Sequence, residues 1–420
     1  MVELSGNPED TKEQAAQIGP VDLVVGLVDP KAGEDLSHTL EIVRTGLTAL
    51  ARPQQVVVLY KSGHEANPTS DSVNQENSLR LLTYAPPPPD PSASFAQLIS
   101  ADYRAMALAS SKLEAKAYIL IASDLETVTP QWVFDLAQPL TEHAFDLVSP
   151  CYVFHKFEGI LNNAILYPLI RSLYGKRIHN PLGPDMGLSA KLLRQVLGSD
   201  SAKPQQNIAS RVTVPIGAEA VSRNFPVCQA NLGERKYPPV DWKNLSSLLA
   251  EVLGPLFQTM ERDAPVWQRV RGSESVPTVG PSLSYVEDAV AVDVRRLLEP
   301  FQLGFRNLQE IWALVLPPKT LFELQRLGRL TTEEFRMPDE LWVRVIYDFS
   351  LGYRLRSISR DHLLRALTPL YLGWVASYAL EVEKMSAPAV QYRLDRLCET
   401  FEAAKPYLVS RWRWPDRFNP

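Results

Sequence analysis

The chain has 420 residues and a formal net charge of −5, which fits about two globular domains and offers no overall basic surface for a nucleic acid polymer. No apolar run approaches the roughly 18 residues that span a bilayer, and the polar start MVELSGNPEDTKEQ lacks a signal-peptide pattern. We therefore expect a cytoplasmic protein without a transmembrane segment, whose three cysteines (Cys151, Cys228 and Cys398) form neither a CxxC zinc site nor a disulfide framework.

The N-terminal part of the chain alternates between strand and helix patterns. Residues 1–19 are polar and aperiodic, as in a flexible tail. The nearly continuous apolar runs Val21–Val28, Val56–Tyr60 and Ala117–Ala122 predict adjacent strands that are buried on both faces of a sheet. Glu34–Leu50 has helical spacing between the first two runs. This order predicts an α/β fold with a mostly parallel sheet.

The segments between and after these strands have patterns of their own. His64–Ser94 is polar and then proline-rich, which predicts a long loop with a short strand at Leu79–Leu82. Phe95–Leu113 has the composition of an alanine-rich helix. Further on, Thr129-Pro130 has the N-cap threonine and first-turn proline of a helix start, and Asp146–Ser149 predicts another short strand.

From about residue 236 the pattern becomes helical. Apolar residues recur at helical spacing over Leu245–Leu256 and in several later segments up to Ala404. We therefore predict a first domain over residues 20–235 and a helical domain over residues 236–420. The C-terminal SRWRWPDRFNP has no helical period, so we expect an ordered, extended strap. Three tryptophans in this half are expected to be buried: Trp374, Trp412 and Trp414.

Ligands of open α/β sheets bind at the carboxyl ends of the strands, which directs attention to Asp29, Lys61 and Asp124. Asp124 and Glu126 are two carboxylates just after a predicted strand, and such a pair can hold a hard divalent cation that in turn binds a diphosphate. The alternative is a surface turn with an acidic start to the helix that follows. The spacing alone leaves both interpretations open.

The segment Phe154–Ser189 contains further candidates. A predicted helix over Ile160–Tyr174 precedes the basic pair Lys176 and Arg177, and a loop follows in which glycines flank Asp185. Such glycines let the backbone approach a ligand closely. The Asp185 carboxylate is suited to accept a hydrogen bond from a sugar or acceptor hydroxyl, and the basic pair is suited to a phosphate. The alternative is a structural loop after a solvated basic helix end.

This segment resembles the corresponding stretch of bacterial family-2-like glycosyltransferases related to glucosyl-3-phosphoglycerate synthase and mannosylglycerate synthase. Those relatives have a strand that ends in DSDL or DADI, an HKxxG segment, a helix with tyrosine and arginine, and a PxGG(D/E) loop. The matching residues here are His155, Lys156, Gly159, Asn163, Tyr167, Pro168, Arg171, Tyr174, Gly175, Lys176, Arg177, Pro181, Gly183, Asp185 and Gly187. The resemblance implies a GT-A (Rossmann-like) nucleotide-sugar-binding domain and retaining transfer of a hexose.

The chain departs from the resembled pattern mainly where the donor and its metal would bind. The first aspartate of the DxD motif is replaced in Ala122-Ser123-Asp124, and a metal-binding histidine corresponds to Tyr237. The first-strand motif is replaced by Gly26–Lys31, and the nucleobase-binding motif of the second strand by Tyr60–His64. Since Mg²⁺ and Mn²⁺ need carboxylate ligands that they share with phosphates, we expect Mg²⁺ or Mn²⁺ binding to be weak.

Two hypotheses follow from the resemblance and its departures. In the first, the chain is a glycosyltransferase with an altered donor site, in which Asp124 and Asp185 are the catalytic residues. Asp124, with or without Glu126, would ligate the metal, and Asp185 would orient the acceptor in the same cleft. In the second, the chain is a catalytically silent paralogue, a pseudoenzyme that acts as a binding or scaffolding subunit.

The expected partners of the active form are a nucleotide-sugar and a small or phosphorylated acceptor. Lys176 and Arg177 are the candidates for phosphate binding, and Asp29 and Lys61 are the candidates for contacts with the donor. We also expect the chain to form a homo-oligomer.

Overall fold

The computed structural model describes residues 18–28, 37–52, 54–61, 79–84, 106, 113–122, 127–153, 155–198, 216–235, 244–281 and 292–415. The predicted tail before residue 18 lies outside these ranges. So do the predicted helix Phe95–Leu113, apart from Met106 and Leu113, and the predicted loop His64–Ser94, apart from residues 79–84.

The chain forms two compact units whose segments interleave along the sequence. The sheet unit comprises Met1–Val153, Ile178–Lys236 and Val276–Ser284, and the helical unit comprises Phe154–Arg177, Tyr237–Ser275 and Tyr285–Pro420. The units are groups of contacting residues rather than continuous stretches of sequence, so the predicted division between residues 235 and 236 stays a prediction.

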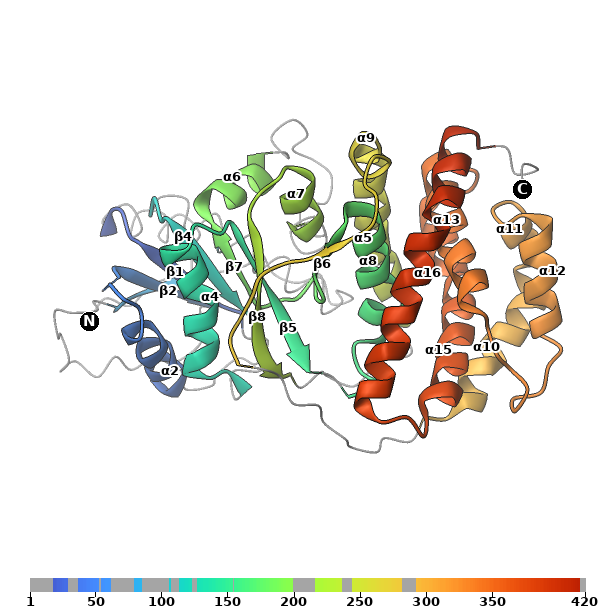
Figure 1. Ribbon diagram of the computed structural model, residues 1–420, viewed down its shortest axis with the longest axis horizontal. Helices are drawn as coiled ribbons and strands as arrows, with labels where there is room; N and C mark the ends of the chain where they lie inside the picture. The colour runs from blue at the N-terminus through green and yellow to red at the C-terminus, as the bar shows by residue number, and fades with distance from the viewer. Residues whose placement is uncertain are drawn as a thin grey trace. The chain divides into compact units, whose positions relative to one another are not determined.

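Among the described residues, the sheet unit contains an eight-stranded mixed sheet with the order β10-β8-β5-β7-β4-β1-β2-β3 (Figure 1). Every neighbouring pair is parallel except those of β7, which runs antiparallel to both β4 and β5. The strands are β1 (Leu23–Leu27), β2 (Val56–Lys61), β3 (Leu79–Tyr84), β4 (Ala117–Ile121), β5 (Leu147–Val153), β7 (Met186–Ser189), β8 (Val227–Glu234) and β10 (Thr278–Val279). The predicted mostly parallel, Rossmann-like α/β architecture is therefore confirmed.

The central strands form where the sequence has continuous apolar runs. All five residues of β1 and all five of β4 are buried, because helices cover both faces of the sheet at this point. β1 pairs with β2 on one side and with β4 on the other, so the three strongest apolar runs are adjacent strands as predicted.

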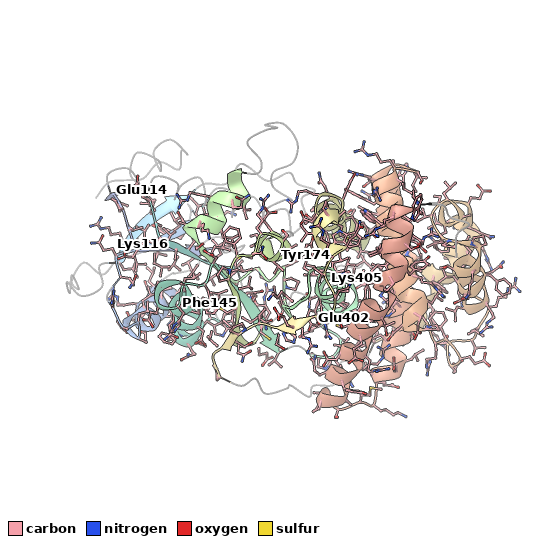
Figure 2. The ribbon with its side chains drawn as sticks, turned by 45° about the horizontal axis from the view of Figure 1, so that its top comes forward. Glu114, Lys116, Phe145, Tyr174, Glu402 and Lys405 are labelled. Atoms are coloured by element: carbon pink, nitrogen blue, oxygen red, sulfur yellow. The ribbon has the colours of Figure 1, made fainter. Side chains whose placement is uncertain are left out.

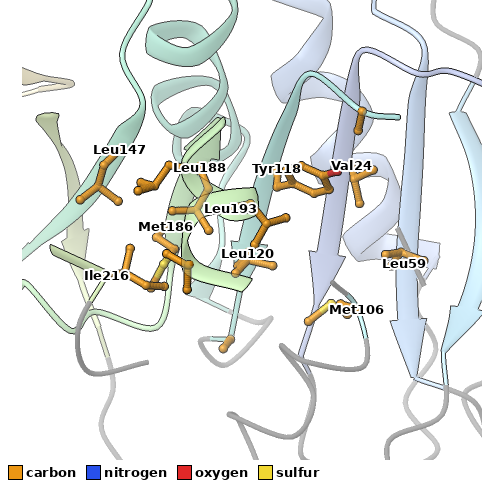
Figure 3. Packing of buried hydrophobic residues seen from close by; sticks show 14 of the residues in the cluster. Val24, Leu59, Met106, Tyr118, Leu120, Leu147, Met186, Leu188, Leu193 and Ile216 are labelled. Atoms are coloured by element: carbon orange, nitrogen blue, oxygen red, sulfur yellow. The ribbon is translucent and has the colours of Figure 1, made fainter. Parts of the chain in front are cut away.

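Helices pack on both faces of the sheet. On one face, Leu193 and Ile216 from two helices join Tyr118 and Leu120 in a single apolar cluster (Figure 3). On the other face a helix packs so closely that a Cβ atom on Gly187 would lie 2.8 Å from Leu136 O. The helices of this unit are α2 (Ser37–Thr48), α4 (Pro130–Glu142), α6 (Ala190–Gly198) and α7 (Ile216–Ser222).

The predicted start of α4 is confirmed. The Thr129 side chain accepts a 3.3 Å hydrogen bond from Trp132 N, and Pro130 occupies the first helical position, where no N–H group is needed.

The helical unit is built around large buried aromatic side chains. Trp342 stacks on Trp374 with ring centroids 5.8 Å apart, and both are fully buried with Trp267 and Trp312. A short ribbon pairs β6 (Lys176–Arg177) with β9 (Glu274–Ser275). The helices are η2 (Asn162–Leu166, a π-helix), α5 (Tyr167–Tyr174), α8 (Leu245–Arg262), α9 (Ala264–Trp267), α10 (Val294–Asn307), α11 (Gln309–Ala313), α12 (Pro318–Leu327), α13 (Asp339–Leu355), α14 (Arg360–Ala366), α15 (Thr368–Val382) and α16 (Ala387–Arg413). None of the described helices combines the length and the apolarity needed to cross a membrane.

The predicted extended strap at the C-terminus is wrong for the residues that the structure describes. α16 continues as a helix through Arg413, and residues 416–420 lie outside the description. The helix extends because Leu408 and Trp412, four residues apart, share one buried face, and Trp412 meets Trp267 edge to face at 5.2 Å. Arg354 also donates a hydrogen bond to Trp412 O near the helix end.

The predicted burial of tryptophans in this region is confirmed for Trp374 and Trp412 but not for Trp414, which is 70 % exposed. Trp414 is the C-cap residue of α16, where the chain turns away from the buried face that carries Trp412.

Candidate functional site

The structure describes four of the seven residues predicted to form the site. Asp29, Asp124 and Glu126 lie outside the described residues, as does Tyr237, so a metal site and a cleft shared by Asp124 and Asp185 stay predictions. The described residues belong to different units. Lys61 and Asp185 belong to the sheet unit, and Lys176 and Arg177 belong to the helical unit.

Asp185 is fully buried and joins two strand ends. Its Oδ1 atom accepts a 2.8 Å hydrogen bond from the main-chain N–H of Ala122, and its Oδ2 atom accepts a 2.5 Å hydrogen bond from the Tyr152 hydroxyl. A buried carboxylate is costly unless hydrogen bonds replace its hydration, and these two donors supply that compensation. Asp185 therefore holds the residue that follows β4 and a residue near the end of β5 in one arrangement.

The antiparallel course of β7 brings Asp185 to this place. Met186 pairs with Leu120 of β4, so Asp185 lies opposite Ile121, the last residue of that strand, and beside Ala122. A parallel strand at the same position would enter the sheet from the opposite edge. Ala122 and Asp185 are 63 residues apart in the sequence, and the order of the strands brings them together, not a local motif.

The glycines around Asp185 have a packing role. A Cβ atom on Gly183 would lie 2.0 Å from Pro150 Cγ, and a Cβ atom on Gly187 would lie 2.8 Å from Leu136 O. Both positions are closed by protein atoms. These glycines therefore let the loop and β7 fit against β5 and α4, and the close approach of a ligand to this backbone stays a prediction.

Two residues that the sequence analysis did not single out complete this region. The Tyr152 ring lies 6.0 Å from the Trp132 ring, and the Arg235 guanidinium carbon lies over the Tyr152 ring, 5.4 Å from its centroid. Arg235 directly follows β8 and is only 5 % exposed. We call Ala122, Tyr152, Asp185 and Arg235 the strand-end cluster, because they gather where the parallel strands β4, β5 and β8 end.

A sequence signal for both missed residues existed. In open α/β sheets the rule that ligands bind at the carboxyl ends of strands holds for every parallel strand and not only for the three strongest apolar runs. Applied also to β5 and β8, it points to Tyr152 and Arg235. The weaker apolar patterns of these two strands concealed that signal.

At the other side of the sheet unit, Lys61 is the last residue of β2 and is half-buried. It pairs in register with Tyr84 at the end of β3, whose hydroxyl donates a 3.3 Å hydrogen bond to Leu27 O of β1. Lys61 therefore lies at the carboxyl end of the parallel strands, as the prediction of a ligand contact requires.

In the helical unit, the basic pair on β6 already has protein partners. Lys176 forms an ion pair with Glu274 of β9, and that hydrogen bond lowers the pKa of the Glu274 carboxyl. Arg177 Nε donates a 3.1 Å hydrogen bond to Ser273 Oγ. A phosphate at this ribbon would therefore compete with Glu274 for Lys176.

A buried lysine on α16 holds the turn that connects the end of α5 to β6. Lys405 Nζ donates hydrogen bonds to Ser172 O (2.6 Å), Leu173 O (3.0 Å) and Val270 O (3.1 Å), two of which are carbonyls near the end of α5. Figure 2 shows Lys405 and Glu402 near Tyr174, the last residue of α5. Burial lowers the pKa of Lys405 to about 8. A cation at a helix C-terminus stabilises the helix, so Lys405 anchors the turn that leads into Lys176.

The described residues do not fit a divalent metal. Within the described ranges, no group of three or more His, Cys, Asp or Glu side chains is placed to hold a metal ion. At the strand-end cluster the side chain of Ala122 has no ligand atom, and Asp185 accepts hydrogen bonds on both oxygens. The charged group that the cluster adds is the guanidinium of Arg235, which repels a cation.

No protein-family model matches the chain, and no curated protein matches it. Among solved structures, the chain is similar to glucosyl-3-phosphoglycerate synthase from Mycobacterium tuberculosis in complex with phosphoglyceric acid (TM-score 0.35, 17 % identity, 63 % of this chain and 86 % of that chain). The complex of that enzyme with Mn²⁺, uridine-diphosphate-glucose and phosphoglyceric acid has a TM-score of 0.32 at the same identity and coverage.

The chain is also similar to mannosyl-3-phosphoglycerate synthase from Rubrobacter xylanophilus (TM-score 0.35, 14 % identity, 63 % of this chain and 82 % of that chain). The α/β fold class of this chain is shown by its own features: an open, mostly parallel sheet with polar side chains gathered at the strand ends.

Proposed function

We propose that the chain is a GT-A glycosyltransferase that transfers a hexose from a nucleotide-sugar to a small or phosphorylated acceptor with retention. The observation that carries the proposal is the strand-end cluster, which lies where open α/β sheets bind their ligands. The motif resemblance over residues 155–187 supports the class of reaction, because it covers the loop that places Asp185 in this cluster.

In this proposal Asp185 is a positioning residue. Both of its oxygens accept hydrogen bonds from protein donors, so the carboxylate acts by fixing Ala122 and Tyr152. Asp124, two residues after Ala122, is proposed to touch the donor with or without Glu126. Proposed contacts to the donor or to a phosphate are Asp29, Lys61, Lys176 and Arg177. The domain division at residues 235 and 236, a homo-oligomeric state and a cytoplasmic location are part of the same proposal.

A second candidate is the catalytically silent paralogue that binds a nucleotide-sugar or its acceptor. The observation that favours it is Ala122, which offers no carboxylate and whose N–H group donates to Asp185. An enzyme that had lost its metal ligand would keep the fold and a binding role, since function depends on the site and not on the fold.

One experiment separates these candidates. The purified chain is incubated with uridine-diphosphate-glucose or guanosine-diphosphate-mannose, with and without 3-phosphoglycerate or glycerate, and with either Mn²⁺ or EDTA. Mass spectrometry measures the product, and NMR of its anomeric proton reports retention. Acceptor-dependent product supports the transferase. Calorimetric binding of a nucleotide-sugar without product supports the silent paralogue, and neither binding nor product contradicts both.

A further inference from the structure

Three segments of the helical unit meet in one place: α9, the last turn of α13 and the last turn of α16. Trp267 of α9 meets Trp412 of α16 edge to face at 5.2 Å. The side chain of Arg413, next to Trp412, donates a 2.9 Å hydrogen bond from Nε to Gln268 Oε1. The guanidinium carbon of Arg354, on α13, lies over the Trp412 ring, 4.7 Å from its centroid. The residues that flank these contacts therefore share one part of the surface.

Each of the three segments exposes a large apolar side chain beside these contacts. Val266 is 40 % exposed, Leu355 is 42 % exposed and Trp414 is 70 % exposed. Single exposed apolar residues are common on protein surfaces, but here each of the three directly precedes or follows a residue of the same contact group. Trp414 is the C-cap of α16, and a ring with this exposure at a helix end projects from the surface instead of lining a groove.

The same surface is basic. Each apolar residue has an exposed arginine close by in sequence: Arg269 after Val266, Arg356 after Leu355 and Arg413 before Trp414. Within the part of the chain that the structure describes, these three arginines have no carboxylate partner. Carboxylates of the neighbouring segments pair with other arginines: Asp263 with Arg262, Glu261 with Arg360 and Asp348 with Arg411. We call this surface the basic-apolar end, made of Val266, Arg269, Leu355, Arg356, Arg413 and Trp414.

Helix stability explains only part of this arrangement. An arginine near a helix C-terminus interacts favourably with the helix dipole, which accounts for Arg356 and Arg413. The dipole does not account for three exposed apolar side chains, because leaving them in water stabilises nothing in the fold. A surface that combines both kinds of side chain is suited to a partner that has negative charge and an apolar layer.

An anionic lipid surface has both of these features. Lipid phosphates pair with arginines, and tryptophan and aliphatic side chains bind at the boundary between headgroups and acyl chains. A nucleic acid attracts arginines and stacks its bases on an aromatic ring such as that of Trp414, but it has no apolar layer for Val266 and Leu355. A bound peptide places its apolar side chains in a groove, whereas the Trp414 ring projects outward.

We propose that the basic-apolar end is a membrane-binding face, which attaches the chain to the surface of a bilayer that contains anionic lipids. The three arginines pair with headgroup phosphates, while Val266, Leu355 and Trp414 enter the headgroup boundary. The attachment is peripheral, through side chains on the surface of the folded helical unit. It goes beyond the proposed transfer of a hexose and does not depend on it.

The test is cosedimentation of the purified full chain with vesicles at physiological ionic strength. One set of vesicles is an equimolar mixture of phosphatidylcholine and phosphatidylglycerol, and the other is phosphatidylcholine alone. We expect partitioning onto the mixed vesicles to be stronger by about tenfold or more, because several arginines near an anionic surface act together. High salt should reduce this difference, since it screens exposed charges.

Two independent sets of substitutions test the two features of the face. Arg269→Gln with Arg356→Gln should weaken partitioning onto the mixed vesicles by about tenfold or more, since each basic residue near such a surface contributes a factor of about five. Trp414→Ala should weaken it by about fivefold, because the ring no longer leaves water on binding. If the double arginine variant does not fold, Arg413→Gln with Trp414→Ala tests the same face.

Matched controls lie on α12 of the same unit. Lys319→Gln with Arg326→Gln removes two exposed charges, and Phe322→Ala removes a ring that is 67 % exposed between them. Both controls should leave the partitioning unchanged. Equal losses in the controls and in the variants of the basic-apolar end would show that binding does not use this face, and the inference would be wrong.

The remaining outcomes are equally decisive. No preference for the mixed vesicles overturns the inference, and so does a preference that the substitutions at the basic-apolar end do not change. The same variants are titrated with an oligothymidine and with a polyglutamate peptide. If the arginine substitutions weaken only one of these interactions and leave vesicle binding unchanged, the face recognises a nucleic acid or an acidic protein, and the membrane proposal is refuted.

Discussion

The main-chain N–H of Ala122 donates a 2.8 Å hydrogen bond to Oδ1 of Asp185, which ties the residue after β4 to the residue before β7. The sequence resemblance predicts that residue 122 corresponds to the first aspartate of a DxD motif. In this chain residue 122 contributes its main-chain N–H group, which holds the Asp185 carboxylate in place. Asp185, which the sequence suggested as a contact for the acceptor, is buried beside it as the hydrogen-bond acceptor.

Asp185→Asn should destabilise the sheet unit by about 1–3 kcal/mol, because the amide nitrogen cannot accept a hydrogen bond and one buried donor loses its partner. Urea unfolding monitored by tryptophan fluorescence measures the change. Asp361→Asn is the matched control, since Asp361 is largely exposed and pairs with Arg365 on its own helix. Equal stability of the two variants would show that the Asp185 contacts contribute nothing measurable.

Trp412→Ala and Trp414→Ala test the helical end of α16. Trp412 is 3 % exposed and contacts Trp267, whereas Trp414 is 70 % exposed. Removing the buried ring should cost about 3–5 kcal/mol, and removing the exposed ring should change stability by less than about 0.5 kcal/mol. Thermal denaturation measures both. A large loss at Trp414 would instead support the extended, packed strap that the sequence suggested.

Lys405 should make the free energy of unfolding increase as the pH rises. Its pKa is lowered to about 8 in the folded chain from 10.5, first by burial and then by Arg271, while Glu402 opposes the shift. Between these two values the unfolded chain binds more protons than the folded chain, so the free energy of unfolding rises as pH rises. The stabilisation is therefore lost as pH falls through about 8.

The comparison with Lys405→Met isolates this effect. Subtracting the free energy of unfolding of the variant from that of the wild type should give a difference that grows from pH 8 to pH 10.5. Urea titrations at several pH values measure it, and other groups that titrate at alkaline pH cancel in the subtraction. A difference that stays constant over this range would contradict the lowered pKa.

Restoring the metal pattern should restore metal dependence. The double variant Ala122→Asp with Tyr237→His places a carboxylate and an imidazole at the two positions that the sequence resemblance predicts to be lost metal ligands. Both are better ligands for Mn²⁺ than a methyl group and a protonated phenol. We expect Mn²⁺ to tighten nucleotide-sugar binding in this variant more than in the wild type, as measured by calorimetry.

The control for this double variant is Ala122→Asn with Tyr237→Phe, which changes size at the same positions but adds no metal ligand of comparable strength. Equal Mn²⁺ dependence of the two double variants would refute the interpretation of Ala122 and Tyr237 as lost ligands.

Local patterns in the sequence determined which segments became strands and helices. The runs around Val25, Val58 and Ile119 predicted the central strands, because a strand covered on both faces must be apolar at every position. Thr129 and Pro130 marked the start of α4. The free N–H groups of the first helical turn need an acceptor, which Thr129 supplies, and this turn tolerates proline, which has no N–H group. These are interactions between near neighbours in sequence, and they can be read without the fold.

Only the tertiary structure decided what surrounds each candidate residue. Asp185 meets Ala122 because β7 inserts antiparallel between β4 and β5, an order that no local pattern specifies. Arg235 gains its place over Tyr152 because β8 lies next to β5. Trp414 faces water although Trp412 is buried, since the end of α16 turns it away from Trp267. Each contact joins residues far apart in the chain, and its energy depends on which elements become neighbours when the sheet and the helices pack.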